Sequence, residues 1–415
     1  MPLPPRTGHA PFTVVNARVF DGIRVVDGLS VRIADGRITD VAPADGLVVA
    51  AGDETVDGTD ATLLPGFIDS HTHPAGDALA LALRFGVTTE LDMFTVPERL
   101  GDQREQAAVR DDMADLRSAS TGATVLGGHP SQLIGLSFRE QFPVVEGPED
   151  AARFVGERVA EGADFIKLLI DDGTATGHPS PSLTEETARV IARTAHEYGL
   201  LAVAHATSEQ NALAAVRAGV DGLVHVYMDR PPRTESIARI RDAGVFVVPT
   251  LVTMGSMAGD LTGRAVAEDP RAHGLVPDAW HANLCQCWDF GEHPSSLRYA
   301  REVTAALHRA GVPLLAGTDA ADVGVLGTAH GVSLHHELRL LVECGLSPAE
   351  ALAAATSVPA DRFRLADRGR IAPGRQADLV LVDGDPASDI DATLSLRAIW
   401  RRGTLLDRTR QAESA

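Results

Sequence analysis

The sequence predicts an α/β protein, a (β/α)8 barrel of the TIM type with a small β-sandwich domain formed from both ends of the chain. In the middle of the sequence, short apolar runs alternate with stretches of helical periodicity, which is typical of parallel strands joined by crossover helices. Both ends show short alternating runs instead. A doubly wound open sheet is the second possibility for the middle.

The small domain is expected to comprise residues 1–62 and 366–415. Alternating runs in the first part are separated by Asp-Gly pairs, which are typical of hairpin turns; they stand at 21–22, 27–28 and 35–36. The same alternation returns at 377–384 and 396–400. Two β-rich ends that flank a different middle most simply pair with each other.

The barrel is expected to comprise residues 63–365. Its predicted strands are 63–70, 87–93, 123–127, 164–170, 200–205, 222–227, 245–251 and 312–318. Predicted helices include 102–118, 148–161, 184–198, 208–218, 234–243 and 330–344. The stretch 252–295 is too long for a plain connection and contains Met and Trp residues, so we interpret it as a lid or a pocket wall.

The charge and the cysteines limit the partners and the compartment. A formal net charge of −20 and a pI near 5.1 disfavour nucleic acid and anionic membranes. A small-molecule substrate is therefore expected, and a homo-oligomer is compatible with this composition. The start of the chain lacks a signal-peptide pattern, and no apolar run reaches the ~20 residues that span a bilayer. Three cysteines are too few for a disulfide framework, so we expect free thiols and a cytoplasmic protein.

The first predicted barrel strand ends in His71-Thr72-His73. Residues two apart on a strand point to the same side, so the two imidazoles should converge. Neutral imidazoles suit Zn²⁺ or a similar divalent ion, but two ligands hold a metal weakly. Further ligands are therefore expected elsewhere in the chain.

Four more chemically active residues lie at the ends of predicted strands, where barrels of this type carry their functional groups. They are Lys167, His205, His225 and Asp319. Lys167 is the single lysine among 37 basic residues, which suggests a chemical need that arginine cannot meet. One histidine on an apolar strand is more often a packed core residue than a ligand, but the joint pattern favours a site.

Taken together, these residues resemble the amidohydrolase superfamily. The segment from Pro65 to His73 is close to the opening motif of that superfamily, and the tail 369–380 resembles its end. Within it, the chain is similar to imidazolonepropionase-like, Xaa-Pro dipeptidase and ochratoxinase-type amidases. The resemblance implies that His71, His73 and Asp319 hold one divalent metal and that His205 and His225 hold a second, with zinc as the leading candidate.

Burial near two cations should lower the pKa of Lys167 toward a neutral amine, which can capture CO₂ as a carbamate. The resemblance implies that this carbamate bridges the metals and that a metal-bridging hydroxide cleaves a C–N bond in an amide, peptide-like, lactam, urea or carbamate substrate. Asp319 is the expected proton shuttle. Tyr227 and His129 resemble substrate-contacting positions of the same group; a packed core tyrosine and a plain loop histidine are the alternatives.

Two rival functions are open. A mononuclear deaminase or a cyclic-amidine or imidazolone hydrolase uses the same barrel, although such relatives usually lack the lysine. A binding protein that has lost catalysis is a second rival, but its usual sign is a missing ligand. Asp69 should point to the same side of the strand as His71. It could support the metal ligands or serve in packing.

Overall fold

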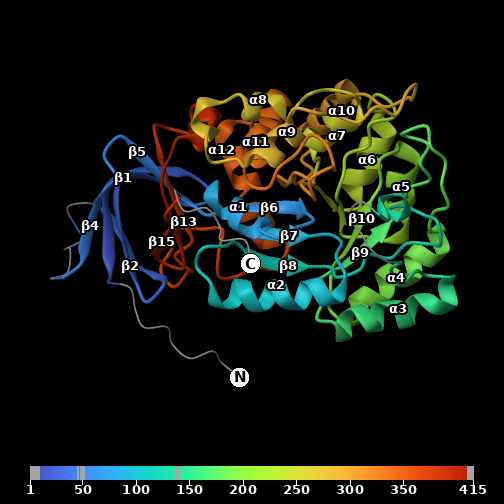
Figure 1. The fold of residues 1–415 in the computed structure, drawn as a ribbon, viewed down its shortest axis with the longest axis horizontal. Coiled ribbons are helices and arrows are strands. Elements are labelled where there is room, and N and C mark those ends of the chain that lie inside the picture. The colour runs from blue at the N-terminus through green and yellow to red at the C-terminus, as the bar shows by residue number, and fades with distance from the viewer. Residues whose placement is uncertain (1–9, 44–45, 47–51, 136–140, 409–415) are drawn as a thin grey trace.

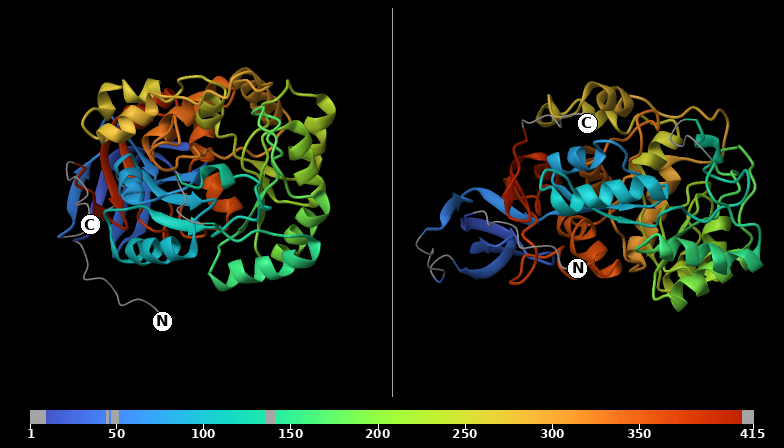
Figure 2. Two further views of the ribbon diagram at one scale, coloured as in Figure 1. Left: turned by 45° about the vertical axis from the view of Figure 1, so that its right-hand side comes forward. Right: turned by 60° about the horizontal axis from the view of Figure 1, so that its bottom comes forward.

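The computed structural model describes residues 10–43, 46, 52–135 and 141–408. A twisted sheet of strands from both ends of the chain lies at one side, and a barrel surrounded by helices lies beside it (Figure 1). Both views in Figure 2 show the N-terminal and C-terminal strands next to one another. The predicted fold, a (β/α)8 barrel with a small β-domain built from both termini, is confirmed.

The small-domain sheet has the strand order β15-β14-β13-β5-β1-β2-β3, with β4 paired to β1. Its strands are β1 (Phe12–Phe20), β2 (Val25–Ala34), β3 (Arg37–Pro43), β4 (Glu54–Asp57), β5 (Ala61–Pro65), β13 (Leu379–Asp383), β14 (Leu396–Arg401) and β15 (Thr404–Leu405). The two ends of the chain meet where β5 and β13 pair antiparallel. Phe12 stacks on Trp400 with ring centroids 5.3 Å apart, inside the apolar core of this domain.

Only part of the predicted turn pattern holds. Asp35 and Gly36 join β2 to β3 with φ values of +52° and +72°, the left-handed pair that tight hairpins favour. Asp27 and Gly28, expected as a turn, lie inside β2 instead. The pairing of β1 with β2 shifts in register near these residues. Gly28, with a positive φ, accommodates this irregularity within the strand and does not form a turn.

The barrel is formed by seven short parallel strands and an eighth extended segment, 312–320. The strands are β6 (Phe67–Thr72), β7 (Val87–Asp92), β8 (Asp115–Ser118), β9 (Ile166–Leu169), β10 (Ala202–His205), β11 (Gly222–Leu223) and β12 (Phe246–Val247). Backbone hydrogen bonds close the ring: Asp164 N donates to Ser118 O (2.8 Å), Leu315 N to Val247 O (2.9 Å) and Ser70 N to Ala316 O (2.9 Å).

Helices follow the strands and cover the outside of the barrel (Figures 1 and 2). They are α1 (Ala78–Arg84), α2 (Pro97–Val109), α3 (Pro148–Ala160), α4 (Glu185–Glu197), α5 (Glu209–Ala218), α6 (Thr234–Asp242), α7 (Leu251–Met257), α8 (Arg264–Ala267), α9 (Asp278–Leu284), α10 (Leu297–Arg309), α11 (Val332–Glu343), α12 (Pro348–Ala354) and α13 (Ser357–Arg362), with short 3₁₀ turns at Ser131–Leu133, Pro270–Ala272 and Ile390–Leu394. Among the described residues, no helix combines the length and the apolar content needed to cross a bilayer.

Two strand predictions were wrong in position. The run from 63 to 70 is divided at Gly66, and its first half belongs to the small-domain sheet. A Cβ at Gly66 would lie 2.2 Å from Thr88 Oγ1, so only glycine lets the chain pass from the sheet into the barrel. The third barrel strand is β8 rather than 123–127, and it falls where the sequence predicted a helix because its residues Asp-Leu-Arg-Ser form no apolar run.

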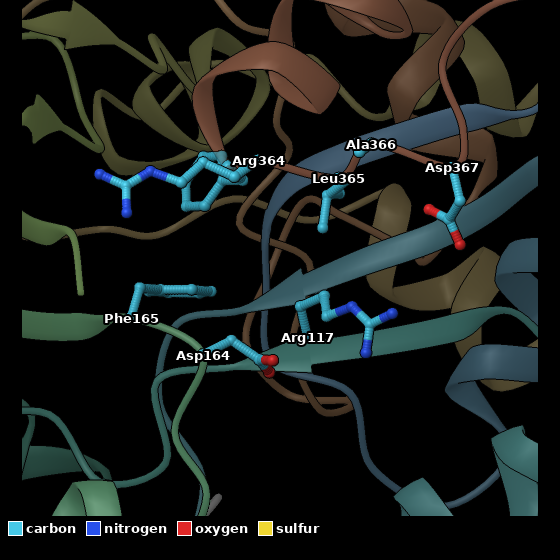
Figure 3. Close-up of a pocket in the computed structure, with 8 residues that line it drawn as sticks. Arg117, Asp164, Phe165, Arg364, Leu365, Ala366 and Asp367 are labelled. Atoms are coloured by element: carbon cyan, nitrogen blue, oxygen red, sulfur yellow. The ribbon is translucent and has the colours of Figure 1, made fainter. Parts of the chain in front are cut away.

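The interior of the barrel is packed at the end where the strands begin. Phe165, Phe246 and Phe363 meet there, with ring centroids of Phe363 at 5.1 and 5.4 Å from the other two. A hollow of about 340 Å³ lies next to this plug, and its lining includes Arg117 and Arg364. Figure 3 shows the residues that line it. Arg117 pairs with Asp115 at 3.2 Å, and Arg364 donates to Gly199 O at 2.8 Å. We therefore interpret this end as structural.

A buried ion pair holds the C-terminal strands together. Arg401 Nη1 donates to both oxygens of Asp378 at 2.9 Å, and Arg402 N donates to Asp378 Oδ1 at 2.8 Å. The side chains of Arg401 and Asp378 are 1% and 2% exposed. Arg401 Nη2 also lies 3.6 Å from Asp115 Oδ1, so removal of Asp378 would leave the buried guanidinium with only this longer contact.

We expect Asp378→Ala to lower the free energy of unfolding by about 3–5 kcal/mol. Urea unfolding followed by circular dichroism measures this. Asp383→Ala is the matched control, because Asp383 pairs with Arg397 at the surface, and its loss should be at most about 1 kcal/mol. Equal losses for the two variants would contradict the assignment.

Candidate metal centre

His71, His73 and Asp319 converge at the carboxyl end of the barrel. His71 Nε2 lies 3.3 Å and His73 Nε2 lies 3.1 Å from Asp319 Oδ1. The Nδ1 atoms point away, because that of His71 donates to Val224 O (2.7 Å) and that of His73 to Phe94 O (3.2 Å). These bonds fix the tautomer and leave both Nε2 lone pairs facing the aspartate.

Asp69 supports this arrangement from the side of β6. It accepts hydrogen bonds from Thr318 N (3.0 Å), Thr318 Oγ1 (2.7 Å) and His71 N (3.2 Å). Asp319 follows with φ = +58°, a left-handed conformation that a non-glycine residue adopts only when its surroundings impose it. Asp69 therefore holds the turn that presents Asp319. Burial and the nearby Glu90 raise the pKa of Asp69 to about 7.

His225 is held through a second chain of contacts. Its Nδ1 is hydrogen-bonded to Thr250 Oγ1 at 2.7 Å, and Thr250 has φ = +50° at the residue before α7. Glu337, on α11, accepts the first two backbone N–H groups of α7, from Leu251 (3.0 Å) and Val252 (2.9 Å). A carboxyl group thus satisfies donors that would otherwise be buried at the start of the helix.

Glu337 gives a testable pH dependence. Burial raises its pKa to about 8, against the lowering effect of the two N–H groups. The folded state therefore keeps a proton that the unfolded chain has lost between roughly pH 5 and 8, so Glu337 makes the fold less stable as pH rises through this range.

We expect Glu337→Gln to flatten the fall in melting temperature between pH 5.5 and 8.5, relative to the wild type. The removed dependence is at most about 1.4 kcal/mol per pH unit. Scanning fluorimetry at several pH values measures it. Glu197→Gln, at an exposed site on α4, is the control. Parallel pH profiles for the wild type and Glu337→Gln would show that Glu337 does not carry the proton.

Lys167 lies on β9 inside the barrel and is 2% exposed. Burial lowers the pKa of its amine to about 7, although Asp319 and Asp92 both act to raise it. A substantial fraction of the amine is therefore neutral near pH 7. A Cβ at Gly122 would lie 3.2 Å from Lys167 Cγ, so the glycine leaves room for this side chain.

His205 contacts the other imidazoles but faces a different carboxylate. Its ring lies 4.4 Å from that of His225 and stacks at 4.4 Å on that of His129. Its Nε2 donates to Asp171 Oδ2 at 2.7 Å, which leaves Nδ1 as the free ligand atom. Burial would raise the pKa of Asp171, but the bond to His205 and the nearby imidazoles hold it below the usual range.

His129 and His205 line one cavity. Burial and the neighbouring His205 lower its pKa to about 3, so the ring is neutral at pH 7. Gln132 Nε2 lies 2.6 Å from His129 Nδ1 and donates to it. That bond leaves His129 Nε2–H as a donor.

Tyr227 is not brought to the cavity. Its side chain is 1% exposed and packs in the core outside the barrel strands, and its hydroxyl is buried. Burial and the carboxylate of Glu209 raise its pKa above the usual value. The structure therefore gives no support to the expected contact between this phenol and a substrate, because a hydroxyl without accessible surface cannot reach one.

These groups open into a cavity of about 620 Å³, a size that suits a small organic molecule. Its lining includes His73, Lys167, His205 and Asp319. From the stretch 252–295, Met257, Trp288 and Phe290 also line it, whereas Met254 and Trp280 are buried elsewhere. Part of that stretch is thus a wall of the cavity.

The donor set fits a divalent metal. Ligand atoms of His71, His225 and Asp319 lie within 4.8 Å of one another. Burial and the nearby Lys167 hold the pKa of His71 well below its ordinary value, and burial and His205 do the same for His225, so both rings are neutral and able to ligate. Although burial acts to raise the pKa of Asp319, His71 and His73 keep it ionised.

Sequence reasoning missed Asp171, Asp92 and Thr250. Asp171 could have been found, because Lys167, Leu169 and Asp171 alternate along one face of a strand. Asp92, whose Oδ1 lies 3.9 Å from His73 Nδ1, ends β7 in the same way. Thr250 carries no sequence signal, since only the tertiary structure brings it to His225.

Comparison with known proteins agrees with this geometry. Residues 62–405 match the profile described as the Amidohydrolase family. The chain belongs to the amidohydrolase family.

Among curated relatives, this amidohydrolase is 26% identical to ochratoxinase of Aspergillus niger over 275 residues, which are 63% of the chain and 50% of the relative. The match thus spans about half the length of that relative. A solved Xaa-Pro dipeptidase superposes with a TM-score of 0.76 at 22% identity, over 95% of this chain and 99% of the other. Molinate hydrolase gives 0.74 at 22% identity, over 96% and 95%. These two likenesses show the fold.

Proposed function

We propose that this amidohydrolase cleaves an amide-like C–N bond of a small molecule with two divalent cations, zinc being our first choice. The bond is an amide, peptide-like, lactam, urea or carbamate bond. In the proposal, His71, His73 and Asp319 hold one cation, His205 and His225 hold the other, and Lys167 bridges them as a carbamate. Four of these side chains, His73, Lys167, His205 and Asp319, line one cavity. Ligand atoms of His71 and His225 lie within 4.8 Å of that of Asp319, and this convergence carries the proposal.

The low pKa of Lys167 supports the carbamate. A neutral amine attacks CO₂, a new N–C bond forms, and one proton leaves to solvent. The product is an anion with two oxygens. An arginine at this position would stay protonated and could not react in this way.

Divalent cations at this site would polarise a substrate carbonyl and increase the acidity of a water molecule. Asp319, ionised and 3.1–3.3 Å from two imidazoles, accepts the proton of the water whose oxygen attacks the carbonyl carbon. It then gives this proton to the departing nitrogen, so a carboxylic or carbamic acid and an amine are released. His129 Nε2–H donates a hydrogen bond to the substrate.

We place the enzyme in the cytoplasm, since Cys285, Cys287 and Cys344 are all free thiols. Cell fractionation would test the compartment, and light scattering would measure the oligomeric state.

The test combines elemental analysis with an activity screen. The protein is loaded with Zn²⁺, Mn²⁺ or Fe²⁺ in the presence of bicarbonate and assayed on amides, lactams, ureas, carbamates, amidines and purines. Two metals per chain with release of an amine support the proposal. One metal per chain with release of ammonia from an amidine or a purine favours the mononuclear deaminase. Full metal occupancy without any hydrolysis would indicate a binding protein.

A further inference from the structure

One wall of the cavity is aromatic. The rings of Trp288 and Phe290 are stacked, with centroids 5.6 Å apart and planes that differ by 9°. Both side chains are only partly buried and line the cavity. The other two tryptophans, Trp280 and Trp400, are buried in packed cores. A flat apolar surface that stays open to the cavity beside the candidate metal ligands indicates a ligand contact.

Backbone contacts set this aromatic wall in place. Trp288 N donates to Ser256 O (3.1 Å) in α7. Ser295 Oγ donates to Ala175 O (2.7 Å), which ties the segment to the loop after β9. The ring of His178, from that same loop, lies edge-on to Phe290 at 5.7 Å. The wall is thus preorganised and would not have to be ordered by a ligand.

The loop that begins at Asp319 lines the cavity together with the aromatic wall. Ala321, Asp322 and Val325 of this loop are all lining residues, as is Met257 from α7. Asn283 Nδ2 donates to Val325 O at 2.8 Å and thereby fixes the loop against α9. The departing nitrogen, which receives a proton from Asp319 in the proposed reaction, is therefore next to the aromatic wall.

The charged side chains on the same side of the cavity as the aromatic wall are acidic. Among described residues of 251–295 and 319–325, those that line the cavity include Asp319 and Asp322 but neither lysine nor arginine. The basic side chains that line the cavity, Arg99 and Lys167, come from other segments of the chain. A carboxylate on the departing amine, if it lay against the aromatic wall, would therefore face Asp319 and Asp322. An uncharged planar ring would cover the open faces of Trp288 and Phe290 at no electrostatic cost.

We propose that the substituent on the departing nitrogen is an uncharged aromatic ring, so that the enzyme releases an arylamine rather than an amino acid. This inference rests on the proposed function and specifies its substrate class. Trp288 is then a specificity-determining residue, and it contacts the amine side of the substrate rather than the acyl side.

The test uses three acetamides that differ only on nitrogen: acetanilide, N-cyclohexylacetamide and N-acetyl-L-phenylalanine. The metal-loaded wild type and Trp288→Leu are compared by kcat/KM. Because each substrate is compared with itself across the variants, differences in intrinsic reactivity cancel. We expect Trp288→Leu to lose about tenfold on acetanilide and under about threefold on the cyclohexyl amide, with Trp288→Phe retaining most of the activity.

A binding measurement separates this inference from the proposed function. Calorimetry at pH 7 should show that aniline binds the wild type more tightly than cyclohexanol, a saturated ring that is also uncharged at this pH. Trp288→Leu should remove the difference while metal content stays the same. If no amide is hydrolysed but this difference is present, the proposed function fails and the aryl subsite stands. Equal losses on all three substrates, a preference for N-acetyl-L-phenylalanine, or aniline binding unchanged in Trp288→Leu would overturn the inference.

Discussion

Replacement of Lys167 by alanine is expected to lower kcat/KM for any amide substrate by at least about a thousandfold and to reduce the metal content per chain. The size follows from the loss of a group that holds both cations, since metal-based stabilisation of the transition state is worth several kcal/mol. Steady-state kinetics and elemental analysis on the same preparation measure both effects.

The expected loss depends on chemistry rather than on charge. Lys167 is 2% exposed and its pKa is lowered by burial to about 7, which keeps much of the amine neutral. Lys167→Arg keeps a long basic side chain but cannot form a carbamate. We therefore expect this variant to be as inactive as Lys167→Ala.

Rescue with a small acid gives the sharpest control. A short carboxylate such as acetate or propionate has two oxygens and can occupy the space that alanine leaves. It should restore part of the activity of Lys167→Ala and none of that of Lys167→Arg, whose side chain fills the space. An active Lys167→Arg enzyme, or a wild type indifferent to removal of CO₂ during metal loading, would disprove the carbamate.

Asp319→Asn is expected to lower kcat by roughly 10²–10⁴, the range in which positioned proton transfer contributes to catalysis. Asparagine keeps an oxygen close to where Asp319 Oδ1 lies, 3.3 and 3.1 Å from the two imidazoles. It cannot accept a proton. Metal content should therefore fall much less than turnover, and KM should change little.

Asp322→Asn provides the matched control for Asp319. It removes a carboxylate from the same loop and the same cavity, three residues further on. We expect less than about a tenfold change in kcat, because Asp322 has no part in the proposed proton transfer. If Asp319→Asn retained near-normal turnover with full metal content, Asp319 would not be the proton shuttle.

The supporting contacts show where sequence reasoning reaches its limit. The pair His71 and His73 was predictable because strand periodicity alone brings alternate residues to one side. Thr250 and Glu337 were not, because they reach His225 through the start of α7 and through a helix that follows much later in the chain. No local pattern encodes contacts of this kind.

The misplaced strand has a similar explanation. Strand β8 reads Asp-Leu-Arg-Ser, and its polar residues are satisfied by tertiary partners: Asp115 by Arg368, and Ser118 N by Asp164 Oδ2 at 2.8 Å. Without those partners in view, the sequence favours the apolar run 123–127. Tertiary context thus overrides local propensity at this strand.

The sequence alone determined the barrel, the two-ended β-domain and six residues as metal-ligand candidates, because strand periodicity and the ends of β/α units are local features of the chain. Only the tertiary structure decided which groups meet and in what ionisation state. It turned His205 toward Asp171, buried Tyr227 away from the cavity and lowered the pKa of Lys167. The physical reason is that burial and the approach of charges from distant parts of the chain act through space. Neither can be deduced from residues that are neighbours in the sequence.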